Sequence, residues 1–584
     1  VCPFCTIIIG INRIISALIP SLTVLITANF VDTAMNIYRG EEARSHIFTP
    51  LILYMLIILY SYTKNAFIFN FVNIRYDMKI FRFVRRMMVE KRGRLEYRHI
   101  ENNDSWDLIT RTCNNALGKI AAGMNNLFDG AELIIRIGSV LLILTTQVWW
   151  VGLLVLVITI PLLFLAAKGG KEIYKANQEA QKHERRATYL QEVLTKRDYV
   201  EERSLFGYTD HVNEKWHEKF EISRKINLKV QLKNFIRMKG SSILTIGISL
   251  LIIGVLLYPL SKKAISIGMF MGLTSATLDL VHMMSWRLAY VTRTWAENLE
   301  YLKDLTAFMA LSEREGATDL PSDTKELSFD SIEFRNVSFK YPDTEKYILK
   351  DFNLKIMEGL HYAFVGINGA GKTTITKLLT GMYDNYEGEI LINGESIRSY
   401  PLSKLKALFS VVYQDFAKYS VTLKDNIILG NVLDIENGTV DEGKVAHAAD
   451  NIGLGDEIAH LPNGMDTYLG KIKEGGMDLS GGQWQRLAVA RTIYNPALVR
   501  ILDEPTAALD PVAESSMYEM FGDISKGETT IFITHRLGAA KLADEIIVLD
   551  EGRVVEQGNH DTLLSLGGIY SEMFESQRSW YSMA

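Results

Sequence analysis

Long apolar segments crowd the first half of the chain and do not recur in the second half. A membrane-spanning helix needs about 20 mostly apolar residues, and this length is met at residues 7–33, 49–71, 126–146, 149–168, 241–259 and 264–285. The intervening stretches 72–125 and 169–240 are long and rich in Lys and Arg. The positive-inside rule therefore places these stretches, and both termini, in the cytoplasm.

The character of the chain changes after about residue 310. Residues 311–330 are polar and contain Pro321, as is typical of a linker. From Ser331 onward, short β-rich runs alternate with helical ones, which indicates an α/β domain. We therefore expect an α-helical six-span transmembrane domain (1–310), a linker (311–330) and an α/β domain (331–584).

The overall charge and the cysteine content exclude some classes of protein. The net charge of −5 argues against a nucleic-acid partner, because such binders are usually basic. Three cysteines do not suggest a disulfide framework.

The segment GINGAGKTT contains the clearest chemical motif in the α/β domain. It follows an apolar strand and opens a helix, and it fits the pattern G-x-x-x-x-G-K-[ST]. Its glycines let backbone N–H groups approach phosphate oxygens, Lys372 supplies a positive charge, and the Thr373 hydroxyl is a ligand for Mg²⁺. The residues expected to bind ATP here are Gly366, Asn368, Gly369, Ala370, Gly371, Lys372, Thr373 and Thr374.

A second acidic element, ILDEP, ends another predicted strand. Asp503 is suited to hold Mg²⁺ through a water, and Glu504 to orient or deprotonate the attacking water. Gln414 and His535 also follow strands, where a sensor of the γ-phosphate is expected. Arg500 is unusual inside a strand buried on both faces, so we expect it to emerge at a strand end or to pair with a carboxylate.

The order of GINGAGKTT, Gln414, LSGGQ, LDEP, ALD and His535 resembles the nucleotide-binding domain of ATP-binding cassette (ABC) transporters. With the preceding spans, the whole chain resembles an ABC exporter half-transporter of the type IV, ABC-B-like group. This resemblance implies an ATP hydrolase coupled to transport, with ATP and Mg²⁺ as cofactors. It assigns adenine stacking to Tyr341, Mg²⁺ binding to Gln414 and a switch role to His535. It also assigns communication between two sites to Ala508–Asp510, with Asp510 as the inter-site residue.

The LSGGQ segment implies a partner. Ser480 and the amides of Gly481 and Gly482 are expected to start a helix and so form another anion site, which Gln483 completes. In the family, each ATP lies between the phosphate loop of one cassette and the LSGGQ of the other, so a second half-transporter is required. Intact Glu504, His535 and LSGGQ favour a homodimer, although a heterodimer stays open. Short helices near residues 101–109 and 198–207 are expected to dock on the cassettes.

Several charged residues fall inside the predicted spans, where they usually face a cavity or the bundle interior. Glu132 and Arg136 are four residues apart and can pair with each other. The candidates for a substrate cavity are Lys64, Arg136, Asp279 and His282.

These features favour an ATP-driven exporter in the bacterial cytoplasmic membrane, with its cassette in the cytoplasm. The variants LSGGQWQR and THRLGAAKLAD resemble exporters of small peptides, so we expect an amphipathic peptide as cargo. A multidrug exporter and a lipid flippase are alternatives within the same class. An ATP-gated membrane sensor is the alternative from another class.

Overall fold

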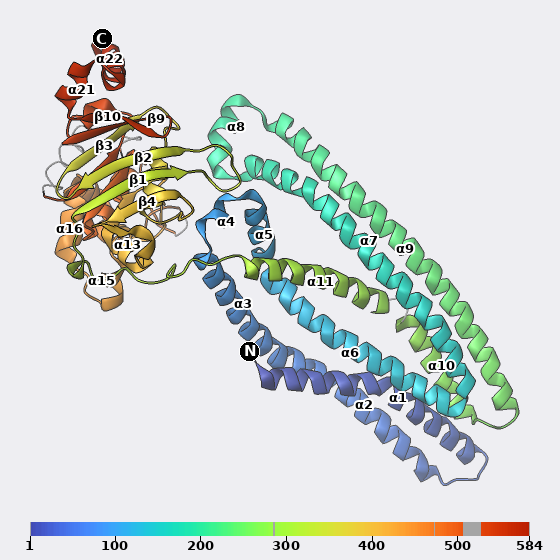
Figure 1. Ribbon diagram of the computed structural model, residues 1–584. Coiled ribbons are helices and arrows are strands. Elements are labelled where there is room, and N and C mark those ends of the chain that lie inside the picture. The colour runs from blue at the N-terminus through green and yellow to red at the C-terminus, as the bar shows by residue number, and fades with distance from the viewer. Residues whose placement is uncertain (1, 284–286, 472–473, 506–526, 583–584) are drawn as a thin grey trace. The chain divides into compact units, whose positions relative to one another are not determined.

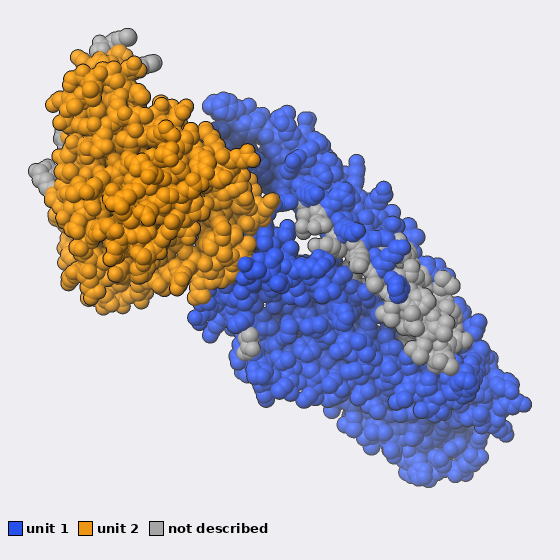
Figure 2. Space-filling view, viewed as in Figure 1, with its two compact units in different colours: residues 1–90, 107–310 blue, residues 91–106, 311–584 orange. Residues whose placement is uncertain are grey.

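The computed structural model describes the chain except residues 1, 284–286, 472–473, 506–526 and 583–584. The chain forms two compact units, coloured separately in Figure 2. The first contains residues 1–90 and 107–310 and is helical. The second contains residues 91–106 and 311–584 and holds the strands.

Long helices make up the first unit, and α7 and α9 lie side by side along much of their length (Figure 1). A π-helical turn, η2, follows α2 directly. The bounds are α1 Pro3–Tyr38, α2 Phe48–Phe67, η2 Ile68–Asn73, α3 Ile74–Arg94, α5 Asn103–Cys113, α6 Ala116–Gln147, α7 Trp149–Thr195, α8 Val200–Phe206, α9 Thr209–Ser261, α10 Ile267–His282 and α11 Leu288–Ala310.

Five of the predicted apolar segments coincide with α1, α2 (running into η2), α6, α7 and α9, and α10 covers residues 267–282 of the sixth. Among the described residues, two helices are long and apolar enough to cross a membrane by composition alone, Pro3–Tyr38 and Arg44–Lys64. The complete six-span arrangement stays a prediction.

Charged side chains inside this helical unit pair differently from the sequence-based expectation. Glu132 is buried and accepts hydrogen bonds from Arg13 of α1 at 2.8 Å and from Arg287 at 3.0 Å. Arg136 contacts Asp279 of α10 at 3.5 Å. The expected Glu132–Arg136 pair is therefore wrong, because tertiary packing brings two other arginines to this carboxylate.

Strands of the second unit form two sheets among the described residues, in the orders β2-β1-β4-β5 and β10-β9-β3-β8-β7-β6. The first sheet is antiparallel, and the second is parallel except for its β10 edge. The expected α/β architecture is confirmed. The bounds are β1 Ser331–Phe339, β2 Leu349–Met357, β3 His361–Gly366, β4 Glu387–Ile392, β5 Glu395–Ser396, β6 Phe409–Val412, β7 Val499–Asp503, β8 Thr529–Ile533, β9 Glu545–Asp550 and β10 Arg553–Gly558.

Helices of the second unit surround these sheets. Their bounds are α4 Tyr97–Glu101, α12 Lys372–Leu379, α13 Leu402–Leu408, α14 Leu423–Ile428, α15 Val432–Asn437, α16 Glu442–Asp450, α17 Gly455–His460, α18 Gly481–Tyr494, α20 Leu537–Ala540, α21 His560–Leu566 and α22 Ile569–Ser582.

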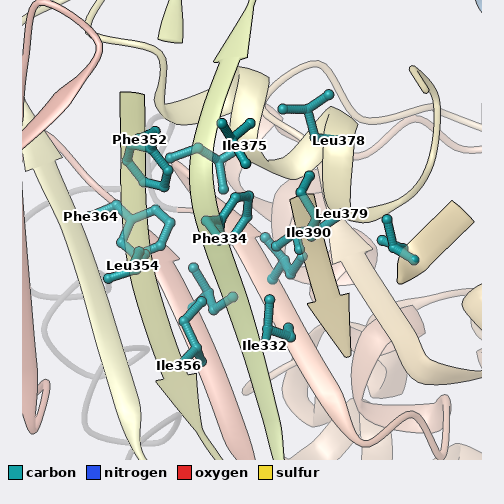
Figure 3. Close-up of a cluster of buried hydrophobic side chains, with 14 of the residues drawn as sticks. Ile332, Phe334, Phe352, Leu354, Ile356, Phe364, Ile375, Leu378, Leu379 and Ile390 are labelled. Carbon is teal, nitrogen blue, oxygen red and sulfur yellow. The ribbon is translucent and has the colours of Figure 1, made fainter. Parts of the chain in front are cut away.

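A cluster of buried apolar side chains holds α12 against both sheets (Figure 3). Ile375, Leu378 and Leu379 of α12 pack in the same cluster as Phe334 of β1 and Phe364 of β3. Full burial of such a side chain stabilises the fold by about 1.5–3 kcal/mol. The helix that carries the phosphate-loop lysine is therefore fixed by the core of the unit.

Arg500 lies in β7 and is buried, as its strand position suggested. It pairs with Glu528 and donates to the carbonyl oxygen of Thr492 at 3.4 Å. Burial lowers its pKa to about 10. The expected carboxylate partner is confirmed.

Candidate nucleotide site

The site lies where the carboxyl ends of parallel strands meet. Val412 of β6 pairs with Leu502 of β7, and Asp503 pairs with Ile533 of β8. Ile533 in turn pairs with Phe364 of β3, just before the phosphate loop. Ligands of open α/β sheets bind at this edge of the strands. The register thus brings the phosphate loop, both carboxylates and His535 to one edge, as the sequence predicted.

The phosphate loop requires glycine at its ends. Gly366 has φ +149° and a Cβ there would lie 2.2 Å from the carbonyl oxygen of Leu549. Gly371 has φ +102° and precedes the first residue of α12, Lys372. These contacts and dihedral angles exclude larger residues, so the backbone can close around a small anion.

Lys372 is held inside this loop. Its ammonium donates to the carbonyl oxygens of Gly366 at 2.8 Å and of Ile367 at 3.1 Å. Burial lowers its pKa from the ordinary lysine value, while the charges of Glu504 and Asp503 act in the opposite direction. Phosphate oxygens would compete with the two carbonyls for its N–H groups and would restore a strong charge partner.

Asp503 ends β7 in an unusual environment for a carboxylate. It is 1% exposed, and neither of its side-chain oxygens has a hydrogen-bond partner among the described residues. Burial raises its pKa to about 6, against the lowering influence of Thr373 and Lys372. A buried carboxylate without a partner is energetically unfavourable, and a cation would relieve this cost.

The donor set fits a magnesium ion bound together with a nucleotide. Among the described residues, no three His, Cys, Asp or Glu side chains are grouped as metal ligands. A cation here would depend on Asp503, on the hydroxyl of Thr373 and on phosphate oxygens, all of which are oxygen ligands that Mg²⁺ prefers. Gln414, two residues beyond β6, is exposed at the same edge and adds an amide oxygen.

Glu504 and His535 form a pair beside Asp503. Nε2 of His535 lies 2.8 Å from Oε1 of Glu504. The Glu504 backbone has φ +50°, a strained region for this residue type, and its N–H donates to Ile533 at 2.9 Å. Such strain occurs most often at functional sites. Burial and the nearby charge of Lys372 lower the pKa of His535, although Glu504 acts to raise it.

The LSGGQ segment starts a helix, as predicted. Ser480 is the N-cap of α18, and its hydroxyl accepts from the N–H of Gln483 at 3.3 Å. The Gln483 side chain accepts from the N–H of Ser480 at 2.9 Å, which completes a capping box. The N–H groups of Gly481 and Gly482 in the first turn have no partner within their own helix, so this end can attract an anion.

Tyr341 lies beside the phosphate-loop helix, where an adenine-stacking residue is expected. Its hydroxyl is 2.9 Å from Oγ1 of Thr374. The ammonium of Lys377 lies 5.2 Å from the Tyr341 ring centre and 2.6 Å from Oε1 of Glu101. Although burial opposes the charge, the hydrogen bond to Glu101 raises the pKa of Lys377.

Glu101 ends α4, so the short segment 91–106 reaches the cassette. Its carboxylate also accepts from the hydroxyl of Tyr383, and Asn102 donates to Asp343 at 2.6 Å. Glu101 and Asn102, at the start of the segment predicted to dock, therefore contact the cassette, while docking of a helix over residues 101–109 stays a prediction. Sequence reasoning missed Lys377 and Tyr383, which carry the contact, because neither belongs to a phosphate-binding motif. The docking role near 198–207 stays a prediction, and Asp510 lies outside the described residues.

The structure describes the side chains of three of the four candidates for a substrate cavity. Arg136 and Asp279 pair with each other, and Lys64 lines a cavity between α1 and α2. His282 ends α10, and its side chain lies outside the described residues.

The parallel sheet carries a phosphate loop, a buried aspartate and a strained glutamate at one edge. This combination defines a nucleotide hydrolase. The same chain also contains the unit of long helices. Family models agree with both parts: the ABC transporter model matches residues 349–507, and the ABC transporter transmembrane region matches residues 4–281. The chain belongs to the ABC transporter family. It is a half-transporter, with one transmembrane region and one ATPase cassette.

Individual relatives cover nearly the whole chain. The subtilin transport ATP-binding protein of Bacillus subtilis is 31% identical over 97% of this chain and 90% of its own. The nisin transport ATP-binding protein of Lactococcus lactis subsp. lactis is 27% identical over 97% of this chain and 92% of its own. A solved bacterial Atm1-family ABC exporter with ATP bound has a TM-score of 0.79 at 24% identity. The structural match covers 97% of this chain and 98% of the exporter chain, and it supports the two-part fold described above.

Proposed function

We propose that this protein exports a small amphipathic peptide from the cytoplasm of a bacterium, driven by ATP. The observation that carries the proposal is the end-to-end similarity to the subtilin and nisin transport proteins. A multidrug exporter is the second candidate, because a putative multidrug export protein of Staphylococcus aureus is 40% identical over 43% of this chain. The subtilin and nisin transport proteins match over nearly the whole chain, which favours a peptide as the cargo.

The working unit is a pair of chains, preferably two copies of this one. Each chain holds one phosphate loop and one LSGGQ helix start, and two cassettes packed head to tail complete two sites. Each ATP would then contact Lys372 and Tyr341 of one protomer and the Ser480 end of α18 in its partner.

The geometry of the edge supports a role for each residue. Gly366–Thr374 would surround the phosphates, and Thr373, Asp503 and Gln414 would hold Mg²⁺, which would neutralise charge on the phosphate oxygens. Glu504 orients and deprotonates the attacking water, and His535, 2.8 Å away, fixes the Glu504 side chain. Binding of two ATP closes the cassettes, and hydrolysis reopens them, so that the helical units alternate between inward and outward access.

Transport in proteoliposomes with outward-facing cassettes tests the proposal. Subtilin, nisin and a hydrophobic dye would be offered separately, with and without ATP. We expect ATP-dependent accumulation of a peptide, stimulation of ATP turnover by that peptide, and neither effect in Glu504→Gln. Accumulation of the dye without either peptide would favour the multidrug alternative. An ionic current without accumulation would favour a gated channel.

A further inference from the structure

A cavity of about 460 Å³ lies between α1 and α2 of the helical unit. Both helices are long and apolar enough to cross a membrane. Its lining includes apolar side chains, among them Ile11, Ile15 and Phe67. The lining also includes polar side chains, among them Asn12, Tyr60 and Lys64. A volume of this size falls within the range of small-ligand sites, which are mostly apolar with a few polar groups.

Lys64 is the charged group of this cavity. Its ammonium donates to Oγ of Ser16 at 2.9 Å and lies 5.6 Å from the ring centre of Tyr60. No carboxylate lines the cavity among the described residues. Glu132, a carboxylate on α6 of the same unit, is already bonded to Arg13 and Arg287. A charged side chain within a spanning helix is costly, and such residues usually mark a functional site.

Two side chains of the lining, Lys64 and Asn12, keep N–H donors available. An ammonium has three N–H groups, and one of those on Lys64 is used by Ser16. Asn12 accepts from the Tyr60 hydroxyl at 2.9 Å through Oδ1, and its amide N–H groups have no acceptor among the described residues. A lysine ammonium next to amide N–H groups is a combination of donors that suits a carboxylate.

The position of Lys64 along α2 indicates the side from which a ligand enters. Lys64 lies about 24 Å from Phe48 at the other end of the helix, since a helix rises 1.5 Å per residue. The hydrocarbon core of a membrane is about 30 Å thick. With the amino terminus in the cytoplasm, as the basic segments predict, the cavity opens in the cytoplasmic half of the membrane. The π-helical turn η2, which supplies Ile68 to the lining, begins four residues after Lys64, and such turns are frequent at functional sites.

We propose that this cavity binds the C-terminal carboxylate and adjoining apolar side chains of the cargo peptide, with Lys64 as the carboxylate partner. The assignment rests on the proposed peptide export and names the chemical feature that the exporter recognises. Ile11, Ile15 and Phe67 would cover the apolar side chains, while Lys64 and Asn12 bind the carboxylate. A peptide needs partners for its polar end, which this lining supplies, whereas a hydrocarbon chain alone would leave the donors unmatched.

A matched pair of ligands tests the assignment in the full-length protein in phosphatidylcholine nanodiscs. The probe is one fluorescein-labelled, leucine-rich pentapeptide, made with a free C-terminal carboxylate and with a C-terminal amide. Hydrogen bonds to charged groups are worth more than neutral ones, so the carboxylate form should bind about 10- to 100-fold more tightly. Fluorescence anisotropy measures both affinities.

Variants of the cavity separate recognition from folding. Lys64→Met keeps an unbranched side chain and should abolish the carboxylate preference, Lys64→Arg should retain most of it, and Asn12→Leu should reduce it several-fold. Lys262→Met, at an exposed position after α9, is the control and should change nothing. Basal ATP turnover should be unchanged in Lys262→Met, and the melting temperature of each of the four variants shows whether it is folded.

The outcomes distinguish this site from the proposed function. A preference that survives in Lys64→Met, or equal binding of the two peptides to the unmodified protein, overturns the site even when peptides are transported. Binding that depends on Lys64 without ATP-driven accumulation supports the site and contradicts peptide export. Displacement of the peptide by an equal concentration of oleate, with the same Lys64 dependence, reassigns the cavity to a lipid and overturns the peptide assignment.

Discussion

Two buried carboxylates have opposite surroundings: Glu132 in the helical unit and Asp503 in the cassette. Glu132 is bonded to two arginines, whereas Asp503 has no hydrogen-bond partner among the described residues. The first charge is neutralised permanently and holds helices together. The second is the carboxylate that we propose to bind Mg²⁺ together with the nucleotide. The difference shows that the partners of a buried charge, and not its burial alone, separate a structural role from a catalytic one.

The largest effect is expected from Glu504, which lies beside Asp503 and is proposed as the general base. Glu504→Gln removes the general base and should lower ATP turnover by about 10²- to 10⁴-fold. ATP binding and the melting temperature should stay close to those of the unmodified protein, because the amide has the same shape. Phosphate release at saturating ATP measures the change, with the exposed Glu358→Gln as control. Turnover near the normal rate would reject Glu504 as the base.

Removal of the Glu132 charge should chiefly affect stability. Glu132→Gln leaves Arg13 and Arg287 with one carboxylate neighbour, Asp129, at 2.8 and 3.8 Å. Breaking a buried pair from one side costs about 3–5 kcal/mol, so the free energy of unfolding should fall by about this amount. Denaturant titration in detergent measures it, and a second substitution, Arg287→Gln, should recover part of the loss. An unchanged stability would show that Glu132 has no structural role.

Substitution of Asp503 should change the stability in the opposite direction. Asp503→Asn removes an unpartnered buried charge, so the nucleotide-free protein should gain about 1 kcal/mol or more at pH 7. Loss of a metal-binding carboxylate should lower Mg²⁺-dependent ATP turnover by about 10- to 100-fold. The same unfolding titration, together with a Mg²⁺ titration of turnover, gives both values. A fall in stability would mean that Asp503 has a structural partner.

The nucleotide site of the cassette was predictable from the sequence, because short contiguous motifs specify most of it. A strand, a glycine loop and a helix bearing Lys372 are specified by contiguous residues, and so is the helix start at Ser480. Parallel strands then bring Asp503 and His535 to the same edge. The long apolar segments likewise located helices without knowledge of their packing.

Contacts between distant residues account for what the sequence did not reveal. Arg13 and Glu132 are separated by 119 positions, and no local pattern joins them. Glu101 and Lys377 are separated by 276 positions, and their pair depends on residues 91–106 folding with the cassette. The expected Glu132–Arg136 pair followed helical spacing alone, and tertiary packing offered closer partners.

The smallest expected effect is a pH dependence of Mg²⁺ binding, which should require Asp503. Burial raises the pKa of Asp503 from 3.8 to about 6 in the folded protein. Its protonated form thus stabilises the metal-free fold at low pH, and this contribution is lost as the pH rises through about 6. Below that value Mg²⁺ must displace the proton, so its half-saturating concentration should be about tenfold higher at pH 5 than at pH 7. Titration with Mg²⁺, followed by the fluorescence quenching of a fluorescent ATP analogue, measures Mg²⁺ binding separately from turnover.

In Asp503→Asn the difference between the half-saturating Mg²⁺ concentrations at pH 5 and pH 7 should vanish, while in Glu132→Gln this difference should persist. Equal pH dependence in both variants would place the proton elsewhere and remove the distinction between the two carboxylates.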